Sequence, residues 1–237
     1  MPRPERPTEN LLLAALPQVE RQRLDPFLEA VEMQAGQPIT NPGEPIEHLY
    51  FPYDAVTSTI QEMSDGTTIE TGLMGVEGLA GVQVWLRHTT TIATTFVQVP
   101  GKAHRISTEN FIREVRDRET PLNDLIASYV HGFLVMTSIT AACNRLHSID
   151  QRLCRWLMMI YDRAQRREFP LRHEFLANML GVHRPTVSTA ANMLQKAGYI
   201  AYRYGKLTIL NPEGLLEGAC ECYELSLRKS STNRGRK

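Results

Sequence analysis

The apolar residues between Leu171 and Ile200 recur with a helical period and predict two short helices joined by a tight turn. The apolar positions of the first helix are Phe175, Leu176, Met179 and Leu180. Gly181 is expected to end this helix, because glycine readily adopts the positive φ found past a helix C-terminus. Pro185 suits the first turn of the second helix, whose apolar stripe consists of Val187, Ala190, Ala191 and Leu194. This pattern predicts a helix-turn-helix, whose second helix enters a DNA major groove.

The other face of the second helix is rich in short polar groups. It carries Arg184, Thr186, Ser188, Thr189 and Asn192, where an ordinary solvated helix carries more Glu and Lys. Such groups can hydrogen-bond base edges and phosphates. We expect base contacts from Arg184, Thr186, Ser188 and Thr189, and phosphate contacts from His183, Asn192, Arg203 and Lys206. The alternative is an ordinary helical hairpin inside a core.

The pattern of apolar residues in the N-terminal part of the chain changes at Gly36. Residues 8–34 predict a helical segment interrupted at Pro17. Short apolar runs then follow at His48–Phe51, Val56–Gln61, Thr67–Leu73, Gly81–Leu86, Ala93–Val99 and Lys102–Ile106. Asp65-Gly66 lies between two runs and predicts a hairpin turn. Strands at this spacing predict a small antiparallel roll or barrel.

Residues 121–146 predict one long helix with a seven-residue repeat. Its two interleaved sets are Leu122, Tyr129, Met136 and Cys143, and Leu125, Gly132, Ile139 and Leu146. Such a repeat is typical of a coiled-coil seam, so we expect a homodimer. The expected dimer contacts are Leu122, Leu125, Tyr129, Gly132, Met136, Ile139 and Cys143. The alternative is a helix packed on its own roll through Val130, Phe133 and Leu134, and both contacts can hold together.

Ser148 and Gln151 predict a capping box that opens the next helix, so the HSIDQ segment forms a hinge. Beyond the helix-turn-helix, residues 200–204, Gly205 and residues 206–210 predict a second hairpin, followed by one last helix. We therefore expect an α+β protein with three parts. These are a sensor β-roll domain with N-terminal helices at 1–119, a dimerisation helix at 120–147 and a winged helix-turn-helix domain at 148–237.

The net charge of the chain is zero, but the charges are unevenly distributed. Residues 1–146 hold 11 Lys and Arg against 18 Asp and Glu, a charge of −7, whereas residues 147–237 hold 15 against 8, a charge of +7. An acidic half repels DNA and a basic half attracts it. The two halves are therefore expected to do different jobs, and the basic half is the one with the helix-turn-helix.

Other features of the sequence narrow the class of protein. No run of about 18 apolar residues is visible, and the N-terminal apolar stretch is too short for a signal peptide, so we expect a cytoplasmic protein without a membrane partner. Four cysteines in 237 residues are not a disulfide framework. Because no nucleophile–base pattern or phosphate loop is visible, we expect no enzyme.

In this order of elements, the chain resembles the Crp/Fnr family of bacterial transcription regulators over roughly residues 10–225. The most specific segments are RLCRWLMM, EFLANMLGVHRPTVSTAANMLQKAGYI and the wing YRYGKLTIL. The segments NPGEPIEHLYF and DGTTIETGLMGVEGLAG are similar to the family's cyclic-nucleotide-binding-like sensor domain, and CNRLHSIDQRL with CECY is similar to one subgroup. The resemblance implies a homodimer on a palindromic double-stranded DNA operator, RNA polymerase as a partner, and an effector of unknown identity.

The resemblance also assigns roles to the start of the recognition helix. The family's base-reading arginine falls on Arg184, which implies a guanine-reading role. A second family contact, usually acidic, falls on Pro185, and a third, usually arginine, falls on Thr189. Two of the three positions therefore depart from the family's pattern.

The sensor segment departs from the cyclic-nucleotide binders of the family. These use a Gly-Glu pair for the ribose and, about ten residues on, an arginine for the cyclic phosphate. Here Glu77 lies near the acidic position but out of register, the arginine's slot falls at Ala93 or Thr94, and Arg87 comes too early. The candidate effector pocket is Glu77, Arg87, Thr94 and Thr95, and the expected effector is not cyclic AMP. The alternatives are a true cyclic-nucleotide-responsive regulator and, in a different class, a ligand-binding or scaffold protein without DNA binding.

The cysteines do not match the iron–sulfur pattern of Fnr-type oxygen sensors, which needs a cluster near the N-terminus. The first cysteine is Cys143. Cys220 and Cys222 could bind a metal or sense redox state, but two thiols alone are weak evidence, and no third ligand is visible beside them. We therefore expect no cofactor and no metal, and interpret Cys143, His147 and Cys154 as packing and hinge residues.

Overall fold

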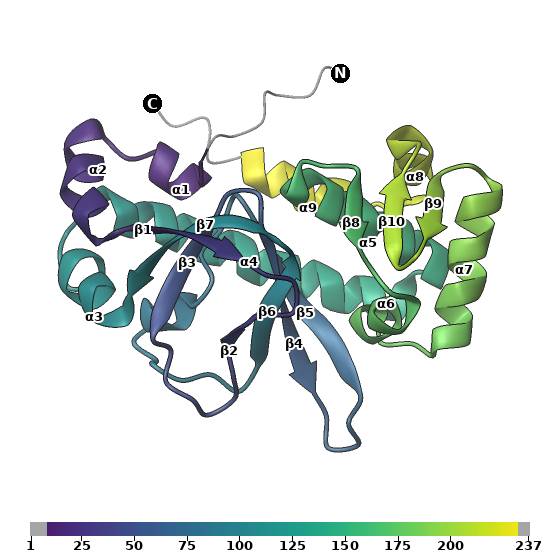
Figure 1. The fold of residues 1–237 in the computed structure, drawn as a ribbon, viewed down its shortest axis with the longest axis horizontal. Coiled ribbons are helices and arrows are strands. Elements are labelled where there is room, and N and C mark those ends of the chain that lie inside the picture. Colours follow the sequence, from purple (N-terminus) through teal and green to yellow (C-terminus); the bar gives the residue numbers. More distant parts are fainter. Residues whose placement is uncertain (1–8, 232–237) are drawn as a thin grey trace. The chain divides into compact units, whose positions relative to one another are not determined.

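The computed structural model describes residues 9–231, with side chains up to Leu227. It is a mixed α/β fold with antiparallel sheets, one long helix and a C-terminal helix-turn-helix, as predicted (Figure 1). The helices are α1 (Leu11–Ala14), α2 (Gln18–Leu24), α3 (Thr108–Phe111), α4 (Pro121–Leu146), α5 (Ile149–Ala164), α6 (His173–Leu180), α7 (Arg184–Lys196), α8 (Pro212–Gly218) and α9 (Cys222–Ser231). The strands are β1 (Glu29–Met33), β2 (Pro38–Thr40), β3 (His48–Pro52), β4 (Val56–Glu62), β5 (Thr68–Met74), β6 (Thr94–Val99), β7 (Gly101–Ser107), β8 (Glu168–Pro170), β9 (Ile200–Arg203) and β10 (Lys206–Ile209).

The chain forms two compact units that interleave along the sequence. The first runs to Thr59 and also contains Leu73–His131 and Arg163–Gln165. The second contains Ile60–Gly72, Gly132–Asp162 and the chain from Arg166 onward. The predicted division at residues 119 and 147 is a different partition and stays a prediction.

The seven strands between residues 29 and 107 form two sheets rather than a closed barrel within the described residues. One sheet has the order β1–β7–β3, and the other has the order β2–β6–β4–β5. In the first sheet, Glu29 lies opposite Arg105, and their side chains form a cross-strand ion pair of 2.8 Å. The predicted hairpin at Asp65-Gly66 is confirmed, because Gly66 has φ of 80° between β4 and β5.

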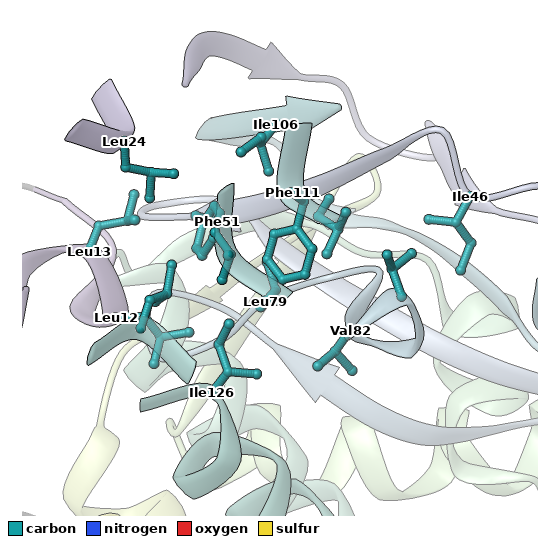
Figure 2. Close-up of a cluster of buried hydrophobic side chains, with 14 residues drawn as sticks. Leu12, Leu13, Leu24, Ile46, Phe51, Leu79, Val82, Ile106, Phe111 and Ile126 are labelled. Atoms are coloured by element: carbon teal, nitrogen blue, oxygen red, sulfur yellow. The ribbon is translucent and has the colours of Figure 1, made fainter. Parts of the chain in front are cut away.

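The core of the first unit gathers side chains from its helices and both ends of its strands. Figure 2 shows Phe51 and Phe111 in the middle of this cluster. Its members are Leu12, Leu13, Leu24, Ile46, Leu49, Phe51, Leu79, Val82, Val84, Ile106, Phe111, Val115, Leu122 and Ile126. Asn10 fastens the N-terminal helices to it, because its buried amide donates to the carbonyls of Pro52 and Gly78, each at 2.8 Å. Its side-chain oxygen accepts from the Leu12 N–H and caps α1.

Three local predictions are wrong. The helix expected to run to residue 34 ends early, and residues 29–33 form β1, because pairing with β7 overrides their local spacing. The run at residues 81–86 contains the 3₁₀ turn Val82–Val84 instead of a strand, after Gly81 adopts φ of 85°. The single last helix is two helices, since α8 ends at Gly218 and α9 begins at Cys222.

The helix-turn-helix in the second unit is confirmed. The predicted apolar stripes are buried: Leu176, Met179 and Leu180 on α6, and Val187, Ala190, Ala191 and Leu194 on α7. Gly181 adopts φ of 61° between the helices, and Pro185 lies in the first turn of α7. The capping box of α5 is also present, because Ser148 N–H donates to Gln151 Oε1 at 3.2 Å and Gln151 N–H donates to Ser148 Oγ at 3.4 Å.

Helix α4 has the predicted bounds but little cover from its own chain. By length and composition alone it could cross a membrane, although it contains no unbroken run of 18 apolar residues. Only 6% of its most apolar 18-residue window is buried. The residues of the predicted seven-residue repeat differ in how far they are exposed. Leu122 and Cys143 are fully buried within the chain, whereas Leu146 is 72% exposed.

The turn at Gly181 generates a stability prediction with a matched control. Gly181 and Gly198 both have positive φ, of 61° and 74°. A Cβ at Gly198 would meet nothing within 4 Å, whereas one at Gly181 would lie 2.9 Å from Ile69 Cδ1. The left-handed backbone costs an L-residue about 1–2 kcal/mol. We expect Gly198→Ala to lower the free energy of unfolding by this amount in urea titrations, and Gly181→Ala to lower it further. Equal losses would show that Ile69 yields without cost.

Candidate nucleic-acid interface

The polar face of α7 is presented to solvent. The helix starts after the chain reverses direction at Gly181, and Pro185 lies in its first turn. Its apolar stripe is buried against α6. Arg184, Thr186 and Asn192 are exposed, as is His183 just before the helix. Within the described part of the chain, no hydrogen bond or ion pair holds the side chains of Arg184 or Thr186. Both side chains therefore remain available to another molecule.

Two other predicted base-reading residues already have partners. Ser188 Oγ lies 3.1 Å from His173 Nδ1, so its hydroxyl is directed towards α6. Thr189 Oγ1 donates to the carbonyl of Pro185 at 3.1 Å, which uses its proton but leaves its methyl group exposed. The structure thus distinguishes Arg184 and Thr186 from Ser188 and Thr189 within the predicted set.

The wing is a tight hairpin of β9 and β10, with β8 paired on the other side of β10. Tyr204 and Gly205 at its tip both have positive φ, of 50° and 74°, as a two-residue hairpin turn of right-handed twist requires. Tyr204 is fully exposed. Arg203 is exposed and unpaired within the described residues, whereas Lys206 Nζ lies 3.1 Å from Glu168 Oε1.

An open hollow of about 440 Å³ lies between the starts of α6 and α7 and the wing. Its lining consists of Arg172, His173, Glu174, Arg184, Tyr202, Tyr204 and Gly205. Two arginines against one glutamate give this surface a positive balance. A positively charged hollow next to a recognition helix suits a phosphate backbone.

The four predicted effector-pocket residues each have a different environment. Glu77 accepts from Arg163 Nε at 2.7 Å. Arg87 has φ of 67°, is largely exposed and lies 3.9 Å from Asp117. Thr95 is buried, with its hydroxyl 2.9 Å from that of Thr59, and Thr94 begins β6. None of these contacts joins two members of the predicted set.

The expectation that the C-terminal thiols have no third ligand beside them is wrong. Cys220 and Cys222 lie together with Cys143 and His147, and the four donor atoms all lie within 4.8 Å of one another. Burial raises the pKa of the Cys143 thiol to about 12 and also raises that of Cys222. The sequence held a signal for this group, because Cys143 and His147 are spaced by one helical turn and Cys220 and Cys222 form a C-x-C pair.

Comparison with known proteins agrees with this geometry. Residues 151–217 match the model of the Crp-like helix-turn-helix domain. The chain carries a Crp-like helix-turn-helix domain. No curated protein sequence matches the chain.

Solved structures of Crp/Fnr proteins share the fold. The chain is similar to TTHA1359, a CRP/FNR-family transcriptional regulator from Thermus thermophilus, with 20% identity, a TM-score of 0.65 and coverage of 81% of this chain and 98% of that one. FixK2 from Bradyrhizobium japonicum has 13% identity, a TM-score of 0.66 and coverage of 81% and 98%. The c-di-GMP-responsive regulator CLP from Xanthomonas campestris has 16% identity, a TM-score of 0.64 and coverage of 81% and 99%. The matched domain indicates DNA binding through residues 151–217, and the solved structures show that the chain shares their fold.

The surroundings of His173 beside α7 generate a prediction about pH. Burial, and to a smaller extent the charge of Arg184, lower the pKa of His173 below its ordinary value. The unfolded chain therefore takes up this proton at a higher pH than the folded chain. The contribution of His173 to the free energy of unfolding should fall as the pH drops below about 6.5. We expect NMR titration of the His173 ring to give a midpoint below that value and Arg184→Gln to raise it. An unchanged midpoint in Arg184→Gln would show that Arg184 does not act on the ring.

Proposed function

We propose that the chain is a homodimeric, sequence-specific transcription regulator that acts in the bacterial cytoplasm on a palindromic operator, together with RNA polymerase. The observation that carries this proposal is the unpartnered polar face at the start of α7, beside a basic hollow and a wing. A ligand-binding or scaffold protein would have no use for an exposed arginine at this position. The same face would place Arg184 first among the groups that meet base edges.

Within this proposal, the side chains of the interface divide by their geometry. Arg184 and Thr186 read bases from the N-terminal turn of α7, where residues of a recognition helix reach the groove. Ser188 and Thr189 contribute to DNA recognition through the shape of the α7 surface and not through hydrogen bonds to bases, because their hydroxyls are engaged within the chain. His183, Asn192, Arg203 and Lys206 contact phosphates. The guanidinium fork of Arg184 matches the O6 and N7 acceptors of guanine.

The proposed dimer uses the more open side of α4, where Ile139 also packs against the buried Cys143, Cys220 and Cys222 of its own chain. Several residues on the inner side contact their own chain: Phe133 packs on Gly72, Thr137 lies against Thr71, and Met136 Sδ accepts from Arg155. Gly132, Val135, Ile139, Ala142 and Leu146 recur at three and four residues on the opposite side and form a second, apolar stripe. A second copy of α4 covers this stripe in the proposal.

A second copy suits this helix better than a lipid bilayer does. A helix surrounded by lipid carries apolar side chains on every side. Where a membrane helix has polar side chains, they face the interior of a helix bundle and are paired there. The inner side of α4 instead carries Thr137 and Thr140, and Arg155 donates to Thr140 Oγ1 at 3.0 Å. The helix is thus not apolar all round, which suits a dimer seam better than a lipid environment.

We further propose that the effector is not cyclic AMP. The slot of the phosphate-binding arginine is filled by Ala93 and Thr94. Glu77, the nearest acidic group, is already bonded to Arg163. A cyclic phosphate would therefore lack its bidentate charged contact.

Arg184 and Arg203 provide a matched test of DNA recognition, because both are exposed arginines of the same unit. The operator is first obtained by selection of bound DNA from a random pool. We expect Arg184→Ala to weaken operator binding by about 1–3 kcal/mol per half-site and to relax one base position. We expect Arg203→Ala to weaken operator and random DNA alike and to lower the salt slope by about one per charge removed.

The measurement is binding of both variants to operator and random DNA across a salt series. Equal losses for Arg184→Ala on the two DNAs would make Arg184 a phosphate contact. Base preference would then come from Thr186 or from DNA shape. No binding by the unaltered chain to any DNA in the pool would contradict the function itself.

The dimer is tested by two neighbouring substitutions on α4. Val135→Glu places like charges across the proposed seam, whereas Leu134→Glu changes a side chain that is 62% exposed on another side of the helix. A buried unpaired charge costs about 3–5 kcal/mol, which corresponds to a loss of at least about 100-fold in dimer affinity. We expect sedimentation to show monomers for Val135→Glu and dimers for Leu134→Glu at micromolar concentration. The seam is elsewhere if Val135→Glu remains dimeric.

A further inference from the structure

Three cysteines and one histidine converge at the junction between the end of α4 and the start of α9. Cys143 Sγ lies 3.5 Å from Cys220 Sγ, and Cys222 Sγ lies 3.6 Å from His147 Nδ1. The three thiols are 0–5% exposed, and all are free. They come from segments 77 residues apart in the chain. From this geometry we infer that the four side chains bind a single tetrahedral metal ion of the zinc class.

The spacing of the donor atoms suits one ion. Ligand bonds of about 2.0–2.3 Å place the donors of a tetrahedral zinc site roughly 3.3–3.8 Å apart. The Cys143–Cys220 and Cys222–His147 pairs lie in that range, and no pair exceeds 4.8 Å. Thiolate and imidazole ligands in an S₃N set select zinc over calcium or magnesium, which prefer oxygen. Thiolates on different irons of an iron–sulfur cluster lie farther apart than this.

The histidine is oriented as a metal ligand would be. Its Nε2 lies 3.1 Å from Glu221 Oε2, and Glu221 stands between the two cysteines of the C-x-C pair. A proton on Nε2 leaves the lone pair of Nδ1 directed at the thiols. A carboxylate that orients the second nitrogen of a ligating histidine is the usual outer partner in zinc sites.

The charge around the cluster also points to an anionic centre. Arg152 and Arg155 are 9% and 5% exposed, and neither has a carboxylate partner among the residues that the structure describes. Both interact electrostatically with Cys143. Buried charges without a counter-charge are costly. Three thiolates, a neutral imidazole and a divalent cation carry one net negative charge, which these arginines would offset.

The site would fasten the C-terminal segment to the hinge that follows α4. Its ligands on one side flank the last turn of α4, where His147 N–H donates to the Cys143 carbonyl at 3.1 Å. The ligands on the other side flank the break between α8 and α9. Because each of the three metal–thiolate bonds replaces a proton on a buried thiol, metal binding would couple directly to folding of this segment.

The test measures metal in the full chain purified under reducing conditions. Elemental analysis should find about one zinc per chain in the unaltered protein and in Cys154→Ser, a buried thiol outside the cluster. Cys222→Ser and His147→Gln should lose most of it. Glu221→Gln should weaken zinc affinity about 10–100-fold, whereas Glu217→Gln, on the exposed surface of α8, should not. Equal zinc content in all variants would overturn the proposal.

A second measurement needs no variant. Titration of the metal-free chain with Co²⁺ should produce the intense visible bands of tetrahedral cobalt and a thiolate-to-cobalt charge-transfer band, both abolished by one equivalent of Zn²⁺. A weak octahedral spectrum would contradict the site. Stoichiometric iron with acid-labile sulfide would contradict the single ion.

Discussion

One buried guanidinium, on α5, binds the end of the first helix of the helix-turn-helix. Arg152 on α5 donates to the carbonyl of Leu180, at the end of α6, and to Asn144 Oδ1 on α4 at 2.9 Å. The last carbonyls of a helix have no partner within it, and bonds from a charged donor are the strong kind. The carbonyl that Arg152 satisfies comes directly before the turn at Gly181. Arg152 thereby connects α5 to the end of α6, next to the turn that precedes α7 and Arg184.

Local chemistry explains why much of the C-terminal half could be predicted from sequence. Gly181 and Pro185 specify where one helix ends and the next begins, and Ser148 with Gln151 specifies the start of α5. Each signal acts over a few residues and needs no distant partner. The exposed polar face of α7 could be anticipated for the same reason, because the helical period alone separates it from the buried stripe.

Features that depend on distant partners were less accessible. Residues 29–33 have helical spacing but become a strand because β7, far along the chain, supplies their hydrogen bonds. The orientation of Ser188 depends on His173, and the helical period gives no information about that contact. The four-residue spacing of Cys143 and His147 and the C-x-C pair were visible, but the path of α8 brings the two pairs together. The periodicity of a sequence predicts which face of a helix or strand is apolar, but it does not predict which other element that face contacts.

The hairpin of β4 and β5 limits how far this protein is modular. Ile60–Gly72 belongs to the second compact unit, where Glu70 accepts from the indole of Trp156 at 2.9 Å and both side chains are buried. A fragment that begins at the hinge keeps the indole but loses its acceptor, and leaves Gly181 without Ile69 beside it. An orphaned buried donor costs about 1–3 kcal/mol. An exchange of the N-terminal half for that of another chain would therefore have to keep residues 60–72 together with the helix-turn-helix half.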